Sequence, residues 1–158
     1  MPRSFKELST EPGTPLRAQA PNGRDVMAWL QQAQLKLTDA GIAQVSLTTR
    51  LDAAYDAVLF CCLAVACAQG WRAGSEKGHH VVVLEGAAQA IGLTESRFDE
   101  LDTLRDWRSR KYRSGFKVES SEVDEAIAIA TPFLEKVAEW FTSHHATLLK
   151  QVAGRSKE

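Results

Sequence analysis

The sequence predicts an all-α protein, an up-and-down bundle of four to five helices with two long antiparallel core helices. Apolar residues recur at helical spacing through most of the chain, and glycines follow several of these segments. The β-branched run from Val81 to Val83 is typical of a strand, but no partner strand is recognisable elsewhere in the sequence. The length of 158 residues suits one domain around a single core.

The chain divides into three parts. Residues 1–23 contain four of the five prolines, and this composition predicts a flexible N-terminal arm. The sequence of the arm leaves open whether it docks on the rest of the protein. We expect residues 24–150 to form the helical bundle and residues 151–158 to form a disordered tail.

The expected helices are recognised by their apolar stripes and by their start and stop signals. Pro132 lies inside the last helix and should kink it about one turn earlier, near Ala128. The predicted ranges are 24–40, 48 to before 70, 75–78 to 90 or 91, a helix with a capping box at Ser96 and Asp99 that carries residues 101–113, and 120 or 121 to 149 with a capping box at Ser121 and Asp124.

The second expected helix is apolar on all sides from Ala57 onward, so it must be buried on every side. A domain of this size has room for one such central helix if it covers the helix by itself, and otherwise a second subunit must cover part of it. The second possibility gives a first argument for a homodimer. The apolar run ends at Ala68 and is shorter than the roughly 20 residues that a membrane span needs.

Charge and cysteine content favour a soluble cytoplasmic protein. The formal net charge is −1, so any basic character is local. The three cysteines, Cys61, Cys62 and Cys67, lie in one apolar run. This pattern is typical of buried residues in a protein of a reducing compartment, and it does not indicate a disulfide framework or a metal site. The N-terminus lacks an apolar segment of the signal-peptide type.

The stretch from Arg105 to Arg113 contains five basic residues and one acid. On a helix, Arg105, Arg108 and Tyr112 fall on one face. Two interpretations stay open on this local pattern. The stretch is either a solvated basic face that suits the negative end of a helix dipole, or a site for an anionic ligand.

His79 and His80 are the other candidates for chemistry. Adjacent histidines on a helix point about 100° apart and rarely share a metal ion, so we expect no metal site and no cofactor. The simpler expectation is that His80 faces the core and His79 lines the surface.

Several segments taken together resemble the HEPN superfamily, which comprises small helical bundles of prokaryotic toxin–antitoxin, defence and RNA-processing systems. The resemblance covers roughly residues 47–141. It implies a HEPN-like bundle, a homodimer, and a partner of the nucleotidyltransferase type. The segments that carry it are Tyr55, Ala68-Gln69-Gly70-Trp71-Arg72, the helix start Gly78-His79-His80 with the following Val81-Val82-Val83-Leu84-Glu85, and the stretch from Leu101 to Tyr112, which ends in Leu-Arg-x-x-Arg-x-x-x-Tyr.

The chain departs from the family at one position. Active HEPN ribonucleases carry an arginine, a polar residue and, a few places later, a histidine that is often followed by a tyrosine. If Arg105 and Asp106 begin the motif, Tyr112 stands at the tyrosine and Arg110 replaces the histidine. Arginine stays protonated at neutral pH and cannot act as a general base, so the resemblance implies binding without efficient cleavage.

The implied function is that of a catalytically degenerate protein that binds RNA or a nucleotide. Two alternatives stay open, namely an active metal-independent ribonuclease in which His79 or His80 supplies the imidazole, and a protein-interaction module that partners a nucleotidyltransferase. The residues that would carry any catalysis are Arg105, Arg108 and Tyr112. The expected ligand-binding residues are Arg105, Asp106, Arg108, Arg110, Lys111, Tyr112, His79 and His80.

Overall fold

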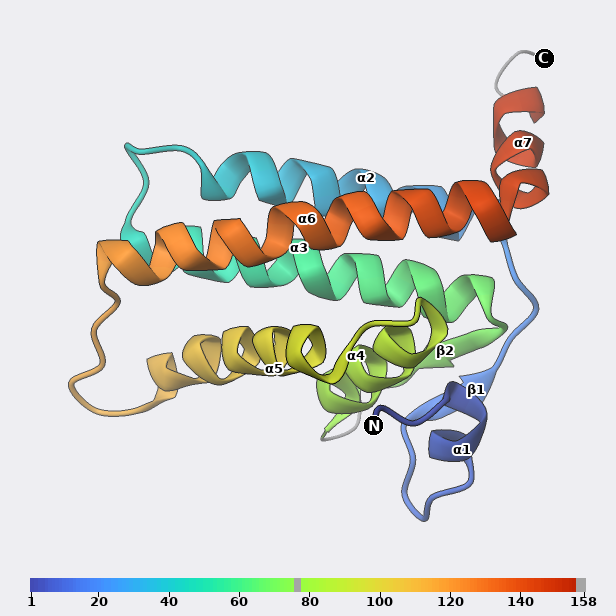
Figure 1. The fold of residues 1–158 in the computed structure, drawn as a ribbon, viewed down its shortest axis with the longest axis horizontal. Helices are drawn as coiled ribbons and strands as arrows, with labels where there is room; N and C mark the ends of the chain where they lie inside the picture. The colour runs from blue at the N-terminus through green and yellow to red at the C-terminus, as the bar shows by residue number, and fades with distance from the viewer. Residues whose placement is uncertain (76–77, 156–158) are drawn as a thin grey trace.

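The computed structural model describes residues 1–75 and 78–155, and it describes residues 151–155 by their backbone alone. The described chain is mostly helical, which confirms the predicted all-α class (Figure 1). Two short strands, β1 (Leu16–Ala18) and β2 (Trp71–Ala73), pair antiparallel. The helices are α1 (Phe5–Ser9), α2 (Gly23–Ala40), α3 (Leu47–Ala68), α4 (His79–Ala90), α5 (Glu95–Ser109), the 3₁₀ turn η1 (Arg110–Tyr112), α6 (Ser120–His144) and α7 (Ala146–Arg155).

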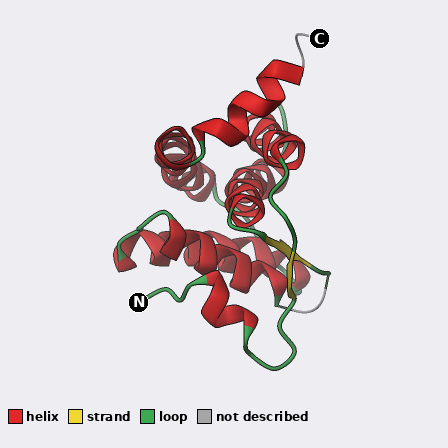
Figure 2. Ribbon diagram, turned by 90° about the vertical axis from the view of Figure 1, so that its right-hand side faces the viewer, coloured by secondary structure: helices red, strands yellow, loops and turns green. Residues whose placement is uncertain are grey.

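Helix α3 is the centre of the molecule. Helices α2, α4, α5 and α6 all contact it, and Figures 1 and 2 show the long helices packed side by side. Nearly every side chain from Ala57 to Ala68 is buried within the one chain, so the apolar character of α3 does not by itself require a second subunit. By length and composition α3 could cross a membrane, but 78% of its apolar window is buried, as in the core helix of a soluble protein.

Neither predicted capping box forms at the expected residues. In α5 the hydroxyl of Thr94 caps the helix, and in α6 Glu119 and Glu122 form a reciprocal capping box. Both capping residues lie two positions before the expected ones, Ser96 and Ser121. Serine is preferred over glutamate as a helix cap, so the sequence favours Ser121 over Glu119.

Helix α6 ends earlier than the sequence predicts. His145 leaves the helical region, and α7 turns away from α6 after it (Figure 1). Both His144 and His145 pack on Trp140, with ring centroids 5.7 and 4.6 Å from the indole. Pro132 lies inside α6, and the kink that we expect one turn before it stays a prediction.

The segment expected to be a flexible arm is instead ordered. Phe5, Leu8 and Leu16 are buried, and β1 pairs with β2 in the segment expected to be a loop. The register sets Leu16 opposite Ala73. The prolines exclude long helices here, but three buried apolar side chains and one strand pairing suffice to hold the segment on the bundle. At the other end of the chain, residues 151–155 continue α7 where the sequence predicts a disordered tail.

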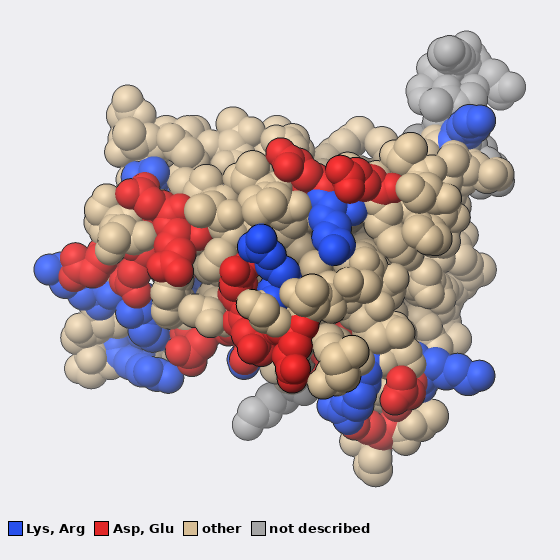
Figure 3. Space-filling model, viewed as in Figure 1, with Lys and Arg blue, Asp and Glu red and all other residues tan. Residues whose placement is uncertain are grey.

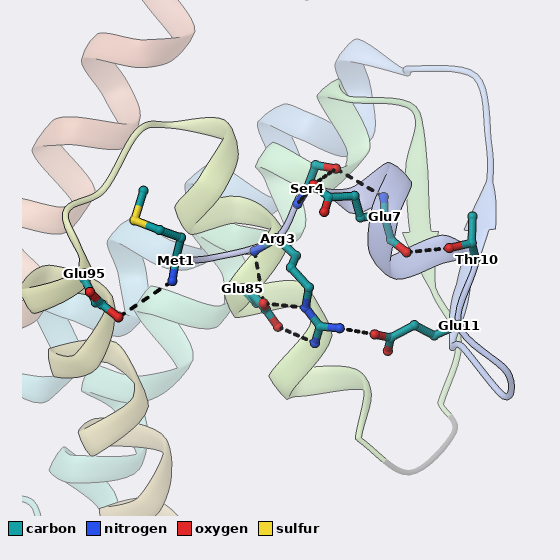
Figure 4. Close-up of polar contacts among 8 residues, drawn as sticks. All are labelled: Met1, Arg3, Ser4, Glu7, Thr10, Glu11, Glu85 and Glu95. Carbon is teal, nitrogen blue, oxygen red and sulfur yellow. Dashed lines mark hydrogen bonds and ion pairs between the residues drawn. The ribbon is translucent and has the colours of Figure 1, made fainter.

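Arg3 fastens the N-terminal segment to α4 (Figure 4). Its Nε donates to Glu85 at 2.9 Å, its backbone N–H donates to the same carboxylate at 3.0 Å, and its guanidinium also contacts Glu11. Burial raises the pKa of Glu85, but hydrogen bonds from Arg3 and its charge outweigh this, so the pKa lies below its ordinary value. The carboxylate therefore stays ionised and paired at neutral pH.

Gly86 leaves the space that this docking needs. The ring of Phe5 occupies the volume in which a Cβ atom at Gly86 would lie. We predict that Gly86→Ala lowers the free energy of unfolding by about 1–3 kcal/mol, the usual cost of overpacking a core. Urea unfolding followed by circular dichroism measures this. Gly41→Ala, at a helix end with negative φ, serves as the control.

A double-mutant cycle assigns the effect to Phe5. If the ring causes the clash, Phe5→Leu should cost less in the Gly86→Ala background than in the wild type. Equal costs in the two backgrounds would contradict the packing described here.

Candidate functional site

Three helices bring Arg108, Tyr55 and His80 together. The guanidinium carbon of Arg108 on α5 lies 5.3 Å from the ring centroid of Tyr55 on α3. The hydroxyl oxygen of Tyr55 lies 3.0 Å from Nδ1 of His80, near the start of α4. The ring of His79 packs edge-on against His80, with centroids 4.2 Å apart. We call Arg108, Tyr55, His80 and His79 together the Arg108 site.

Arg108 carries the one conspicuous unsatisfied group at this site. Its Nε atom is buried and has no hydrogen-bond partner, and no carboxylate forms an ion pair with this guanidinium among residues 1–75 and 78–150. A buried donor without a partner costs about 1–3 kcal/mol. Buried polar atoms are nearly always satisfied by protein, water or ligand, so this atom needs an acceptor that the described side chains do not supply.

His80 is neutral at physiological pH. The pKa of this imidazole is lowered to about 4, first by burial and then by His79, Arg108 and Arg105. Burial also raises the pKa of Tyr55 well above its ordinary value, so the phenol keeps its proton. When the Tyr55 hydroxyl donates to Nδ1, the proton of the neutral imidazole is on Nε2, which leaves a second donor at the site.

Acidic residues of α3 border the same site. Burial raises the pKa of Asp56, while Arg108, Lys36 and Lys111 act in the opposite direction. Asp56 therefore lies close enough to Arg108 to influence it, but outside ion-pair distance. The neighbouring Asp52 accepts from Nζ of Lys111 at 3.1 Å.

Most cations of the basic stretch are already paired within the chain. Arg110, which stands where the resemblance leads us to expect a histidine, lies 2.7 Å from Glu122 of α6 in an ion pair without hydrogen-bond geometry. This contact ties η1 to α6. On the face of the molecule that Figures 1 and 3 both show, acidic and basic side chains are interspersed and no broad basic surface is visible (Figure 3). The remaining pairs are Arg105–Asp102 at 2.9 Å, Lys111–Asp52 at 3.1 Å and Arg113–Asp106 at 4.0 Å.

The structure thus brings together only part of the predicted set. Arg105, Arg108, His79 and His80 lie near one another, whereas Arg110, Lys111 and Asp106 are engaged in ion pairs elsewhere. Tyr112 is 75% exposed, with its ring near Lys111, because the α-helix ends at Ser109 and the expected face does not continue.

Tyr55 is not among the predicted site residues, since its place in a mostly apolar helix is typical of the core. It is indeed fully buried, but its hydroxyl contacts His80. One signal could have identified it. A tyrosine in an otherwise apolar helix carries a hydroxyl that needs a partner inside the protein.

No family model matches the chain, and no curated protein or solved structure matches it either. Among the described residues, no group of three or more His, Cys, Asp and Glu side chains could hold a metal ion. The chemistry of the site must therefore be argued from Arg108, Tyr55 and His80 themselves.

The titration of His80 gives a direct test of this geometry. We predict that its imidazole titrates with a midpoint of about 4, well below the ordinary value of 6.5. A lowered pKa in the folded state means that the unfolded chain binds the proton more readily, so stability should fall as the pH drops from about 6.5 towards 4.

Nuclear magnetic resonance of the histidine ring signals measures this midpoint. Tyr55→Phe removes the hydroxyl that supports the neutral imidazole, and it should raise the midpoint. His144→Gln, on the surface of α6, identifies the signals and should leave the His80 midpoint unchanged. A wild-type midpoint near 6.5 would contradict the burial described here.

Proposed function

We propose that this protein is a HEPN-like helical bundle that binds a phosphate group of RNA or of a nucleotide at Arg108. The observation that carries the proposal is the buried Nε of Arg108, a cationic donor without an acceptor. The order of the segments around Tyr55, His80 and Arg108 supports the resemblance to that family, and the mostly helical fold is compatible with it.

The chemistry of the site suits a phosphate. Arginine binds phosphate oxygens through two parallel N–H groups, and a neutral histidine can add a third donor. The ion pair of Arg105 with Asp102 is partly exposed, with side-chain exposures of 32% and 52%. Such surface pairs contribute at most about 1 kcal/mol, so Arg105 can exchange its partner for a phosphate oxygen.

The ion pairs of the other cations limit the number of phosphate groups that the protein can contact. Arg110, Lys111 and Arg113 would each have to leave a carboxylate before contacting RNA. We therefore expect one or two phosphate contacts. For a single strand, each contact adds about 0.7 to the slope of log affinity against log salt.

Arg108→Gln is the decisive substitution. We predict that it weakens binding of a fluorescein-labelled single-stranded RNA by about tenfold or more in low salt, because a charged hydrogen-bond donor is lost. It should also reduce the salt slope by about 0.7. Fluorescence anisotropy over a salt series measures both quantities.

Arg97→Gln is the matched control, because Arg97 lies in the first turns of the same helix and pairs with Glu100. It removes the same charge and should leave RNA affinity nearly unchanged. Failure of the wild type to bind RNA or a nucleotide in low salt would refute the proposal, and so would equal losses in the two variants.

The proposal includes the assembly that the resemblance implies. We propose a cytoplasmic homodimer that works with a nucleotidyltransferase-type partner in a toxin–antitoxin or defence system. Light scattering after size exclusion tests the dimer. Co-purification of a neighbouring gene product tests the partner.

A metal-independent ribonuclease is the second candidate, and the position of His80 favours it. The neutral imidazole lies beside two arginines, on the helix next to the one that carries the basic stretch. In that reaction His80 would be the other tautomer, with its Nδ1–H donated to the Tyr55 hydroxyl oxygen, and Nε2 would accept the proton of the ribose 2′-hydroxyl as that oxygen attacks phosphorus. The bond from phosphorus to the 5′-oxygen would break, the 5′-oxygen would take a proton from water, and Arg108 would stabilise the negative charge that develops on the phosphate.

We predict that any cleavage by the purified protein persists in EDTA and falls by about 100-fold or more in His80→Gln, since general-base catalysis contributes about that much. Gel electrophoresis of labelled single-stranded and structured RNA measures it. His144→Gln should cleave at the wild-type rate. Cleavage that survives His80→Gln, or that needs a metal ion, would reject this second candidate.

A further inference from the structure

A cavity lies at the end of α3 that is remote from the Arg108 site. It has a volume of about 410 Å³, within the range of roughly 300–1,000 Å³ that is usual for small-molecule sites. The first half of α2, the last turns of α3, strand β2 and Gln19 enclose it. Its lining residues include Asp25, Trp29, Gln32, Cys67, Trp71 and Arg72.

Two tryptophans held by separate elements are among the residues that line the cavity. Trp29 packs on Phe60 with ring centroids 5.4 Å apart, which supports the ring from the side of α3. Trp71 is the first residue of β2 and pairs in register with Ala18 of β1. The backbone N–H of Gln19 donates to the carbonyl of Gly70 at 2.9 Å and fixes the adjoining edge.

The floor is small and chemically inert. Ala66 and Cys67 line the cavity and are themselves buried. Burial raises the pKa of the Cys67 thiol, and the sulfur lies 3.8 Å from the carbonyl oxygen of Asn22. A thiol in this state is a poor nucleophile, so the cavity is suited to binding and not to covalent chemistry.

The rim carries polar groups with free hydrogen-bonding capacity. Within residues 1–75 and 78–150, the side chains of Asp25, Gln19, Gln32 and Arg72 form no hydrogen bond or ion pair. A carboxylate, two amides and a guanidinium thus belong to exposed residues that line an aromatic cavity. This combination of apolar walls and a few polar groups is typical of ligand sites.

We propose that this cavity binds a guanine mononucleotide. The base would lie against the indoles of Trp29 and Trp71, as bases stack on aromatic side chains in many nucleotide sites. The carboxylate of Asp25 accepts the two adjacent N–H groups of guanine, and Arg72 contacts the phosphate. Adenine presents a ring nitrogen acceptor at the corresponding edge, which the carboxylate repels. An organic cation would match Asp25 but is repelled by Arg72.

The proposal does not depend on the function proposed for Arg108. The two sites lie on opposite halves of α3, and no residue that lines the cavity belongs to the Arg108 site. Arg108→Gln should therefore leave binding in the cavity unchanged.

Calorimetric titration with GMP, AMP and choline tests the assignment. We expect GMP to bind about tenfold or more tightly than AMP, and Asp25→Asn to remove most of this preference. Asp39→Asn, an exposed carboxylate in the last turn of the same helix, is the control and should behave as the wild type. Arg72→Gln should weaken GMP more than guanosine.

Trp71→Leu gives an independent readout, because stacking against Trp71 should quench its fluorescence and the variant should lose that change. Melting temperatures establish that each variant is folded. Equal affinity for GMP and AMP, preference for choline, absence of GMP binding by the wild type, or loss of GMP binding in Arg108→Gln would each overturn the proposal.

Discussion

The structure depends on the burial of one apolar helix from all sides. Helix α3 carries almost no polar side chain in its second half, so its free energy is low only when other elements cover its whole circumference. Helices α2, α4, α5 and α6 all contact α3 and supply that cover. The two candidate sites lie against different parts of this helix, one at Tyr55 in its first half and the other at Ala66 and Cys67 in its last turns.

The polar chemistry of the Arg108 site follows from the same constraint. Tyr55 is fully buried in the first half of α3, and its hydroxyl needs a partner there. His80 supplies one, and the guanidinium carbon of Arg108 lies over the Tyr55 ring. An uncharged imidazole and an unsatisfied guanidinium donor are the result of fitting these three side chains beside an apolar core.

The sequence predicted the helices well, because periodicity and glycine stops act locally. It predicted α2 and α3 to within one or two residues. It missed the strand pairing of Leu16 with Ala73, because two three-residue strands far apart in the sequence leave no periodic signal. It also expected an arginine cluster, whereas the ion pair of Arg110 with Glu122 joins residues that only the tertiary fold brings together.

The sheet of β1 and β2 has a consequence for the order in which parts of the molecule open. It joins the N-terminal segment to a strand that follows α3, and it is held by few hydrogen bonds and three buried apolar side chains. Segments of this kind detach by local unfolding at a lower free energy than the global transition. Detachment would remove Gln19 from the lining of the cavity and would remove the strand that pairs with Trp71, and it would leave Arg108, Tyr55 and His80 in place. The two candidate sites therefore differ in resistance to local unfolding, and mild denaturant should abolish the cavity before the Arg108 site.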